Sequence, residues 1–86
     1  MNIALSQRII VHKGFSYDSI EHGWYRLLQG HSLAFVPNRP DQDAYLNRLA
    51  DLVDFLILTG GNDNPVRRLT EVKLASKMLE RKKPVL

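Results

Sequence analysis

Residues 54–65 read DFLILTGGNDNP, and this stretch decides how the chain folds. Residues 55–58 form a continuous apolar run, which is typical of a central strand buried on both faces of a parallel sheet. The second half of the stretch contains Gly60 and Gly61 in succession, although an ordinary connection would need one glycine at most. Pro65 then suits the first turn of a helix. The stretch therefore predicts a buried strand, a glycine loop at its carboxyl end, and a helix directly after the loop.

The segments before this stretch predict two further strands. Residues 2–5 and 9–11 are apolar or β-branched, and the polar tripeptide 6–8 separates them. We interpret this region as a first strand that runs into a polar loop. Residues 32–36 form a second short apolar run, which Pro37 ends because proline cannot donate a hydrogen bond to a neighbouring strand.

Apolar residues that recur every three or four positions predict three helices, over 17–29, 42–52 and 66–83. The first has Asp18 as a candidate N-cap and Gly30 as its C-cap. The buried face of the second is expected to hold Ala44, Tyr45, Leu49 and Leu52. The buried face of the third is expected to hold Val66, Leu69, Val72, Ala75 and Met78, with Leu74 and Leu79 widening it.

The expected elements alternate in the order βαβαβαβ with short connections. This order predicts an α/β fold in which a parallel sheet has helices on both faces, in a flavodoxin-like arrangement. The last strand begins as PVL at 84–86, where the sequence stops. We therefore expect residues 1–86 to be the N-terminal part of a single domain that is incomplete at its C-terminus.

The composition indicates one small globular unit. Of the 86 residues, 44% are hydrophobic and 24% are charged, which excludes the disordered and fibrous classes. The apolar runs are too short to span a bilayer, and no cationic segment precedes an apolar one at the N-terminus, so we expect a cytoplasmic protein without membrane contact. The chain has no cysteine, which excludes disulfides, thiolate metal sites and a cysteine nucleophile within these residues.

The net charge of +3 raises the question of a nucleic-acid partner. The lysines and arginines do not alternate with aromatic residues, however. The densest cationic run, 81–83, lies at the end of a predicted helix, where it complements the helix dipole. We therefore expect no nucleic-acid binding.

The glycine loop does not fit the common phosphate-binding motifs. A dinucleotide-binding turn needs glycines after the first strand, where this chain has SQRII, and a P-loop needs a terminal G-K-[ST], which is absent. Two interpretations of the loop remain. In one, backbone amides of Gly60 and Gly61 bind an anion. In the other, the loop is a tight turn in which Asn62, Asp63 and Asn64 cap the next helix.

Several pieces of the chain occur together in one known family. They are SQR at 6–8, the helix carrying Trp24, FVP at 35–37, DFLILTGGND at 54–63, and LERKKPVL at 79–86. With these pieces in this order, the chain resembles the N-terminal part of class I glutamine amidotransferase-like domains. The resemblance is to the subgroup of γ-glutamyl hydrolases, which includes γ-glutamyl-GABA hydrolases. LTGGND and KKPVL are its most specific motifs.

The resemblance implies hydrolysis of a γ-glutamyl amide by a cysteine nucleophile, with no cofactor and no metal. The nucleophile would lie in a G-x-C-x-G elbow about three residues beyond Leu86, and a more distant histidine and glutamate would activate it. The loop would supply an oxyanion-hole amide from Gly61, with Gly60 giving the loop its shape. The 86-residue chain is therefore expected to be inactive alone.

Other residues allow two interpretations each. Gln7 and Arg8 lie near the expected substrate position and would contact a substrate carboxylate, or they belong to a plain surface loop. Arg67 and Glu71 match an R-x-x-x-E pattern of the subgroup, or they form a surface ion pair at i and i+4. The histidines are expected to be solvated or structural; they are His12, His22 and His31.

The partners follow from these interpretations. A complete enzyme would take a small γ-glutamyl substrate, and this chain would associate with a completing chain or with itself. The alternative, from a different functional class, is a non-catalytic α/β module that binds a ligand or a partner through an open strand edge.

Overall fold

The computed structural model describes residues 1–61 and 63–86. The strands are β1 (Asn2–Leu5), β2 (Arg8–His12), β3 (Phe15–Ser19), β4 (Ser32–Phe35) and β5 (Phe55–Ile57). The helices are α1 (Gly23–Leu27), α2 (Asp43–Leu52) and α3 (Pro65–Glu80). None of the helices in this described part is long and apolar enough to cross a membrane.

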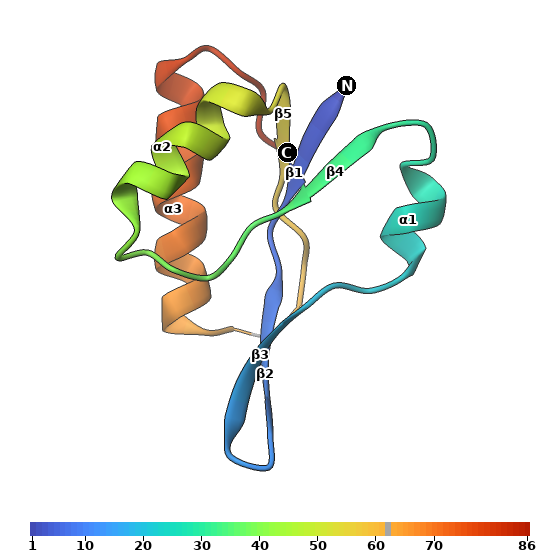
Figure 1. Ribbon diagram of the computed structural model, residues 1–86, viewed down its shortest axis with the longest axis vertical. Coiled ribbons are helices and arrows are strands. Elements are labelled where there is room, and N and C mark those ends of the chain that lie inside the picture. Colours follow the sequence, from blue (N-terminus) through green and yellow to red (C-terminus); the bar gives the residue numbers. More distant parts are fainter. Residues whose placement is uncertain (62) are drawn as a thin grey trace.

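The centre of the fold is a three-stranded parallel sheet in the order β4-β1-β5 (Figure 1). Ile3 in β1 pairs with Leu33 on one side and with Phe55 on the other. Residues 84–86 lie along the outer side of β5, where Leu86 N donates to Leu56 O at 2.9 Å and Leu58 N donates to Leu86 O at 2.8 Å. The expected α/β class with a parallel sheet is confirmed.

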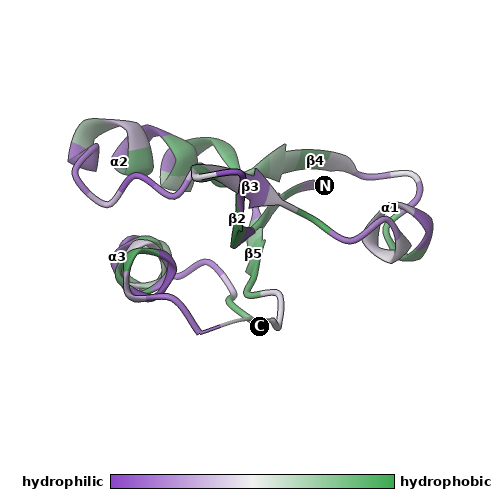
Figure 2. Cartoon of the chain, turned by 90° about the horizontal axis from the view of Figure 1, so that it is seen from below, coloured by the Kyte–Doolittle hydropathy of each residue, from purple (hydrophilic) through white to green (hydrophobic). Residues whose placement is uncertain are grey.

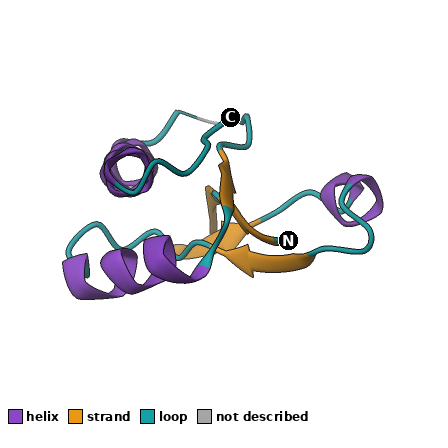
Figure 3. Ribbon diagram, turned by 90° about the horizontal axis from the view of Figure 1, so that it is seen from above, coloured by secondary structure: helices purple, strands orange, loops and turns teal. Residues whose placement is uncertain are grey.

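Helices cover both faces of this sheet (Figure 3). Ala4 and Leu56 face α2 and α3 and lie in the larger apolar cluster of the core. Ile3 and Leu5 point to the opposite face, because successive side chains alternate across a strand, and they pack with Trp24 of α1. The strands of the parallel sheet, β1, β4 and β5, are apolar along most of their length, whereas the helices carry both polar and apolar residues (Figure 2).

The region between β1 and β4 differs from the expected polar loop and long helix. Strands β2 and β3 form an antiparallel hairpin that projects from the sheet, and the helix α1 is limited to Gly23–Leu27 (Figure 1). The turn consists of Lys13 and Gly14, with φ of 51° and 81°, which is the geometry that two-residue hairpins require. The predicted helix over 17–29 was therefore wrong at its start, and Asp18 lies in β3 rather than at an N-cap.

The helices expected over 42–52 and after Pro65 are present, but their expected buried faces were largely wrong. In α2 the buried residues are Leu46, Leu49 and Ala50, and Ala44, Tyr45 and Leu52 are exposed. In α3 they are Arg67, Thr70, Leu74 and Met78, whereas Val66, Leu69, Val72 and Leu79 are exposed. A helix has 3.6 residues per turn, so each step of three residues falls about 60° behind, and five residues at that spacing cannot share one face.

Two ion pairs join α2 to α3 and to Arg81, the C-cap residue of α3. Lys77 Nζ lies 3.0 Å from Asp43, and Arg81 Nε lies 2.7 Å from Asp51. The hydrogen bonds from Lys77 and Arg81 hold the pKa of both carboxyl groups below the usual value of 3.8. Because the folded pKa is lower than the unfolded one, the stability from these pairs is present above that usual value and is lost as pH falls through the folded pKa.

We therefore expect acid to weaken the contact between α2 and α3. The urea midpoint of the chain should fall between about pH 7 and about pH 2.5, and the fall should be smaller in the double variant Asp43→Asn, Asp51→Asn. The double variant lacks the titrating groups, so it already lacks their contribution at neutral pH. Equal falls for the two proteins would show that these pairs do not contribute to the pH dependence.

Candidate functional site

The carboxyl ends of β1, β4 and β5 meet at one edge of the sheet, where open parallel sheets place their ligands (Figure 1). The glycine loop leaves β5 at this edge, the hairpin leaves β1 there, and α3 begins there. A cavity of about 250 Å³ lies between the loop and α3. Its lining consists of Thr59, Gly60, Gly61, Asp63, Asn64, Arg67, Arg68 and Glu71.

The loop starts from a fixed point, because Thr59 is tied to the end of β1. Thr59 N donates to Ser6 Oγ at 2.9 Å, and Thr59 Oγ1 donates to the Ser6 carbonyl at 2.8 Å. Ser6 N in turn donates to the carbonyl of Ile57 at 3.1 Å. Ser6 and Thr59 are both buried, so these bonds are shielded from water and hold the first residue of the loop in place.

Arg67 holds the next part of the loop. Arg67 is only 3% exposed. Its Nη2 donates to the Thr59 carbonyl, to Thr59 Oγ1 at 3.0 Å and to the Gly60 carbonyl at 3.3 Å. Its Nε lies 3.6 Å from the carboxylate of Glu71 one turn further along α3. The guanidinium thus turns two successive carbonyls of the loop toward α3.

This clamp sets the direction of the Gly61 amide. No peptide bond in the described part is cis, and across a trans peptide the N–H points roughly opposite to the preceding carbonyl. Because the Gly60 carbonyl points to Arg67, the Gly61 N–H points away from Arg67. Within residues 1–61 and 63–86, no group accepts a hydrogen bond from this N–H. The loop therefore presents a backbone donor that is fixed in place and still open to an acceptor.

The two glycines differ in what their positions require. Gly61 has φ of 141°, a conformation that L side chains rarely adopt, and a Cβ there would lie 2.6 Å from Arg8 Nε. Gly60 does not have a positive φ, and a Cβ there would meet no atom within 4 Å. The backbone therefore needs glycine at position 61 and does not need it at position 60.

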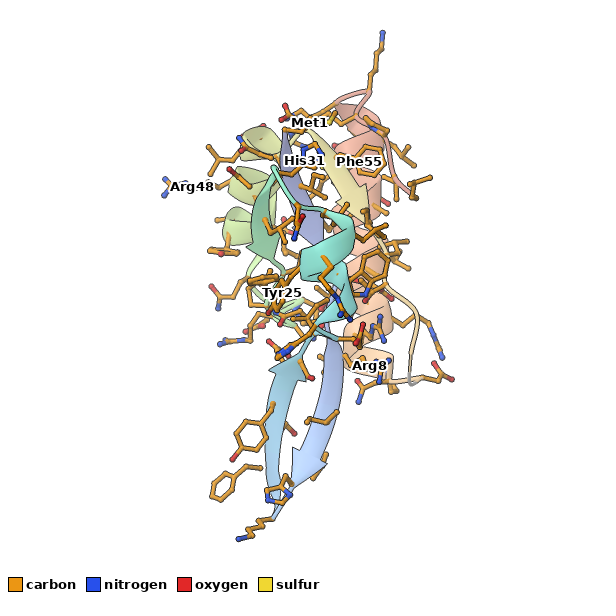
Figure 4. The ribbon with its side chains drawn as sticks, turned by 90° about the vertical axis from the view of Figure 1, so that its right-hand side faces the viewer. Met1, Arg8, Tyr25, His31, Arg48 and Phe55 are labelled. Carbon is orange, nitrogen blue, oxygen red and sulfur yellow. The ribbon has the colours of Figure 1, made fainter. Side chains whose placement is uncertain are left out.

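The two polar residues after β1 point to different places. Arg8 opens β2 at the base of the hairpin (Figure 4). Its side chain lies against Gly61. Its guanidinium forms no hydrogen bond or ion pair with a described residue. Gln7 instead donates from Nε2 to the Val36 carbonyl at 2.9 Å, at the end of β4. The structure therefore brings Arg8, but not Gln7, to the glycine loop.

The capping interpretation of the loop is confirmed for one residue. Asn64 is the N-cap of α3, where its Oδ1 accepts from Val66 N at 2.9 Å and from Arg67 N at 3.2 Å. Asp63 forms an ion pair with the exposed side chain of Arg68. Asn62 lies outside the described residues. Helix capping therefore explains Asn64, but it does not explain the backbone conformation of Gly61.

Two features of the site could not be read from the motifs. Arg67 was expected either to match a family pattern or to form a surface ion pair, but it is buried. The sequence signal for its burial was its spacing from Thr70, Leu74 and Met78, which places all four on one helix face. The second feature is a contact between Asp18 of the hairpin and Asn38 after β4.

The three histidines are exposed, and they are His12, His22 and His31.

The chain was also compared with known proteins. No protein-family model matches it, and no curated protein matches it with significance.

Proposed function

We propose that the chain is the N-terminal part of a class I glutamine amidotransferase-like domain of the γ-glutamyl hydrolase type. The observation that carries this proposal is the open Gly61 N–H at the carboxyl end of a central parallel strand. A donor that is already fixed stabilises a developing negative charge without reorganising, which is how an oxyanion hole acts. In this role Gly61 donates the hydrogen bond and Arg67 fixes the peptide.

The chemistry is acyl transfer. A thiolate, whose proton the later histidine has taken, attacks the γ-carbonyl carbon, and the carbonyl oxygen becomes an oxyanion that accepts from Gly61 N–H. The amine leaves with the proton that the histidine returns, and the carbonyl re-forms as a thioester. Water then releases glutamate from the thioester. Arg8 lies beside Gly61 and forms no ion pair with a described residue, so it would contact a carboxylate of the substrate.

The position of residues 84–86 supports this assignment. They pair with β5, so the strands follow one another across the sheet as β4, β1, β5 and 84–86, which is compatible with a flavodoxin-like order. A strand that continued beyond Leu86 would end at the same edge as the glycine loop. That is where a nucleophile elbow would have to lie. The complete enzyme would be cytoplasmic, with a small-molecule substrate and without a nucleic-acid or membrane partner.

The proposal predicts that the 86-residue chain alone does not hydrolyse γ-glutamyl amides. It carries the oxyanion donor but no cysteine, so the attacking group is missing. The measurement is release of p-nitroaniline from γ-glutamyl-p-nitroanilide by the purified chain, with buffer and a complete γ-glutamyl hydrolase as controls. Hydrolysis above the buffer rate, abolished in the variant Gly61→Ala, would overturn the assignment of a cysteine mechanism.

A second candidate is a non-catalytic interaction module, and one observation favours it. The outward face of α3 exposes four apolar side chains, and the chain end adds a fifth; they are Val66, Leu69, Val72, Leu79 and Leu86. An exposed apolar face of this kind marks an interaction site in many soluble proteins. Sedimentation velocity tests whether this module self-associates. A self-associating module sediments as a dimer or larger. A chain that stays monomeric over a wide concentration range argues against self-association.

A further inference from the structure

A second cavity, of about 340 Å³, lies at the same edge of the sheet between the hairpin and α3. Ile9 and Val66 give it apolar walls, and Ser16, Asp18, Asn38 and Arg39 give it polar ones. Asn64 lines both this cavity and the cavity beside the glycine loop. The two cavities are therefore neighbours on one surface.

Asp18 lies in the wall of this cavity, where it is exposed and accepts two hydrogen bonds from Asn38. Asn38 N donates to Asp18 Oδ2 at 3.1 Å, and Asn38 Nδ2 donates to Asp18 Oδ1 at 2.8 Å. Asn38 is itself buried at 8% exposure, and its Nδ2 also donates to the Gln7 carbonyl at 3.1 Å. Both N–H groups of the Asn38 amide are thus engaged, which orients its Oδ1 as an acceptor. Among the described residues, no group donates to that oxygen.

The charges around the cavity do not cancel. Arg39 binds Asp41 through two hydrogen bonds of 3.0 and 2.9 Å, so its positive charge is already matched. Asp18 forms no ion pair within the described part of the chain. A carboxylate has about four lone-pair positions, and Asn38 occupies two of them. The cavity therefore presents acceptors and one unmatched negative charge.

We propose that this cavity binds the ammonium group of a short aliphatic amine. The ammonium would donate to Asp18 and to Asn38 Oδ1, and the aliphatic part would contact Ile9 and Val66. Where the proposed hydrolase function holds, this cavity takes the amine half of the γ-glutamyl amide. The substrate would then be a γ-glutamyl derivative of a diamine, whose second amino group is free and protonated.

The site can be tested on the chain as it exists. The probe is n-butylammonium, titrated into the ¹⁵N-labelled chain while amide chemical shifts are followed by NMR; n-butanol and butyrate are the neutral and anionic controls. We expect saturable shifts at Asn38 and Val66, with affinity in the millimolar range, and no saturation with either control. Absence of saturable shifts, or tighter binding of butyrate, would overturn the proposal.

Three variants sharpen this test. Asp18→Asn should weaken binding by about tenfold or more, because it removes the charge opposite the ammonium. The matched control Glu80→Gln removes an exposed carboxylate at the far end of α3, outside the cavity lining, and it should leave the affinity within about twofold. Since Asp18→Asn could disturb Asn38, Val66→Trp provides a second route: it fills the cavity while keeping Asp18, and it should abolish binding. Unchanged binding in Val66→Trp, or in a folded Asp18→Asn variant, contradicts the proposal.

This result is separable from the proposed function. If the 86-residue chain binds the amine but no completed form of the enzyme hydrolyses a γ-glutamyl amide, the amine site is supported and the hydrolase function is contradicted. Hydrolysis by a completed enzyme, without amine binding by the chain, would remove the amine site alone.

Discussion

Under the proposed hydrolase function, replacing Gly61 by alanine in the complete enzyme is expected to lower kcat by about 100- to 1000-fold, the usual effect of losing one oxyanion-hole donor. Alanine is strained at φ of 141°, and its Cβ would lie 2.6 Å from Arg8 Nε, so the peptide must move. The N–H then leaves the position in which Arg67 fixes it. KM should change little, because the hydrogen bond strengthens only as the oxyanion forms.

The same substitution can be measured in the 86-residue chain. The strained backbone should lower the free energy of unfolding by about 1–3 kcal/mol, as measured by urea denaturation. Gly60→Ala is the matched control, since its Cβ would meet no atom within 4 Å. It should leave both stability and kcat nearly unchanged. Equal losses of stability and of kcat from the two substitutions would show that position 61 does not require glycine more than position 60.

Replacing Arg67 by methionine is expected to destabilise the chain by about 3 kcal/mol, which is a large part of the stability of a small domain. Methionine keeps most of the volume but donates no hydrogen bond. The carbonyls of Thr59 and Gly60 would lose their donor, and Glu71, with a side chain 20% exposed, would lose its cation. Urea denaturation followed by circular dichroism measures the change.

The neighbouring residue provides the control for this experiment. Arg68 forms an ion pair with Asp63, but both side chains are well exposed, at 61% and 78%. Arg68→Met should therefore change the free energy of unfolding by no more than about 0.5–1 kcal/mol. If Arg67→Met were as mild as Arg68→Met, Arg67 would not clamp the loop.

The glycine loop and the helix after it could be predicted from the sequence, because their signals are local. These signals are a continuous apolar run, two glycines and an Asx residue before proline. Each predicts its element without knowledge of any distant contact. The hairpin was missed because Ile20, Trp24 and Leu28 have helical spacing. They do pack on the sheet, but they reach it partly from outside the helix. The local signal against a long helix was Lys13-Gly14, a two-residue turn between β-branched and aromatic residues.

The functional roles of the polar residues depended on distant contacts. Gln7 and Arg8 are adjacent, but successive side chains of an extended segment point to opposite sides, so only Arg8 reaches Gly61. The spacing of Arg67 from Thr70, Leu74 and Met78 places it on the buried face of α3, but its hydrogen-bond partners, the carbonyls of Thr59 and Gly60, are brought to it by the fold. Asp18 and Asn38 meet only because the hairpin folds back to the end of β4.

The most direct test of the central claim is to read the coding DNA beyond codon 86 in all frames and to measure the intact mass of the protein in its source cells. Our account predicts a G-x-C-x-G elbow directly after the strand that begins at Pro84, with a histidine and a glutamate further on. Gly61 is then the oxyanion donor of a γ-glutamyl hydrolase. Absence of such an elbow in every frame, together with a mass that matches 86 residues, would contradict this account.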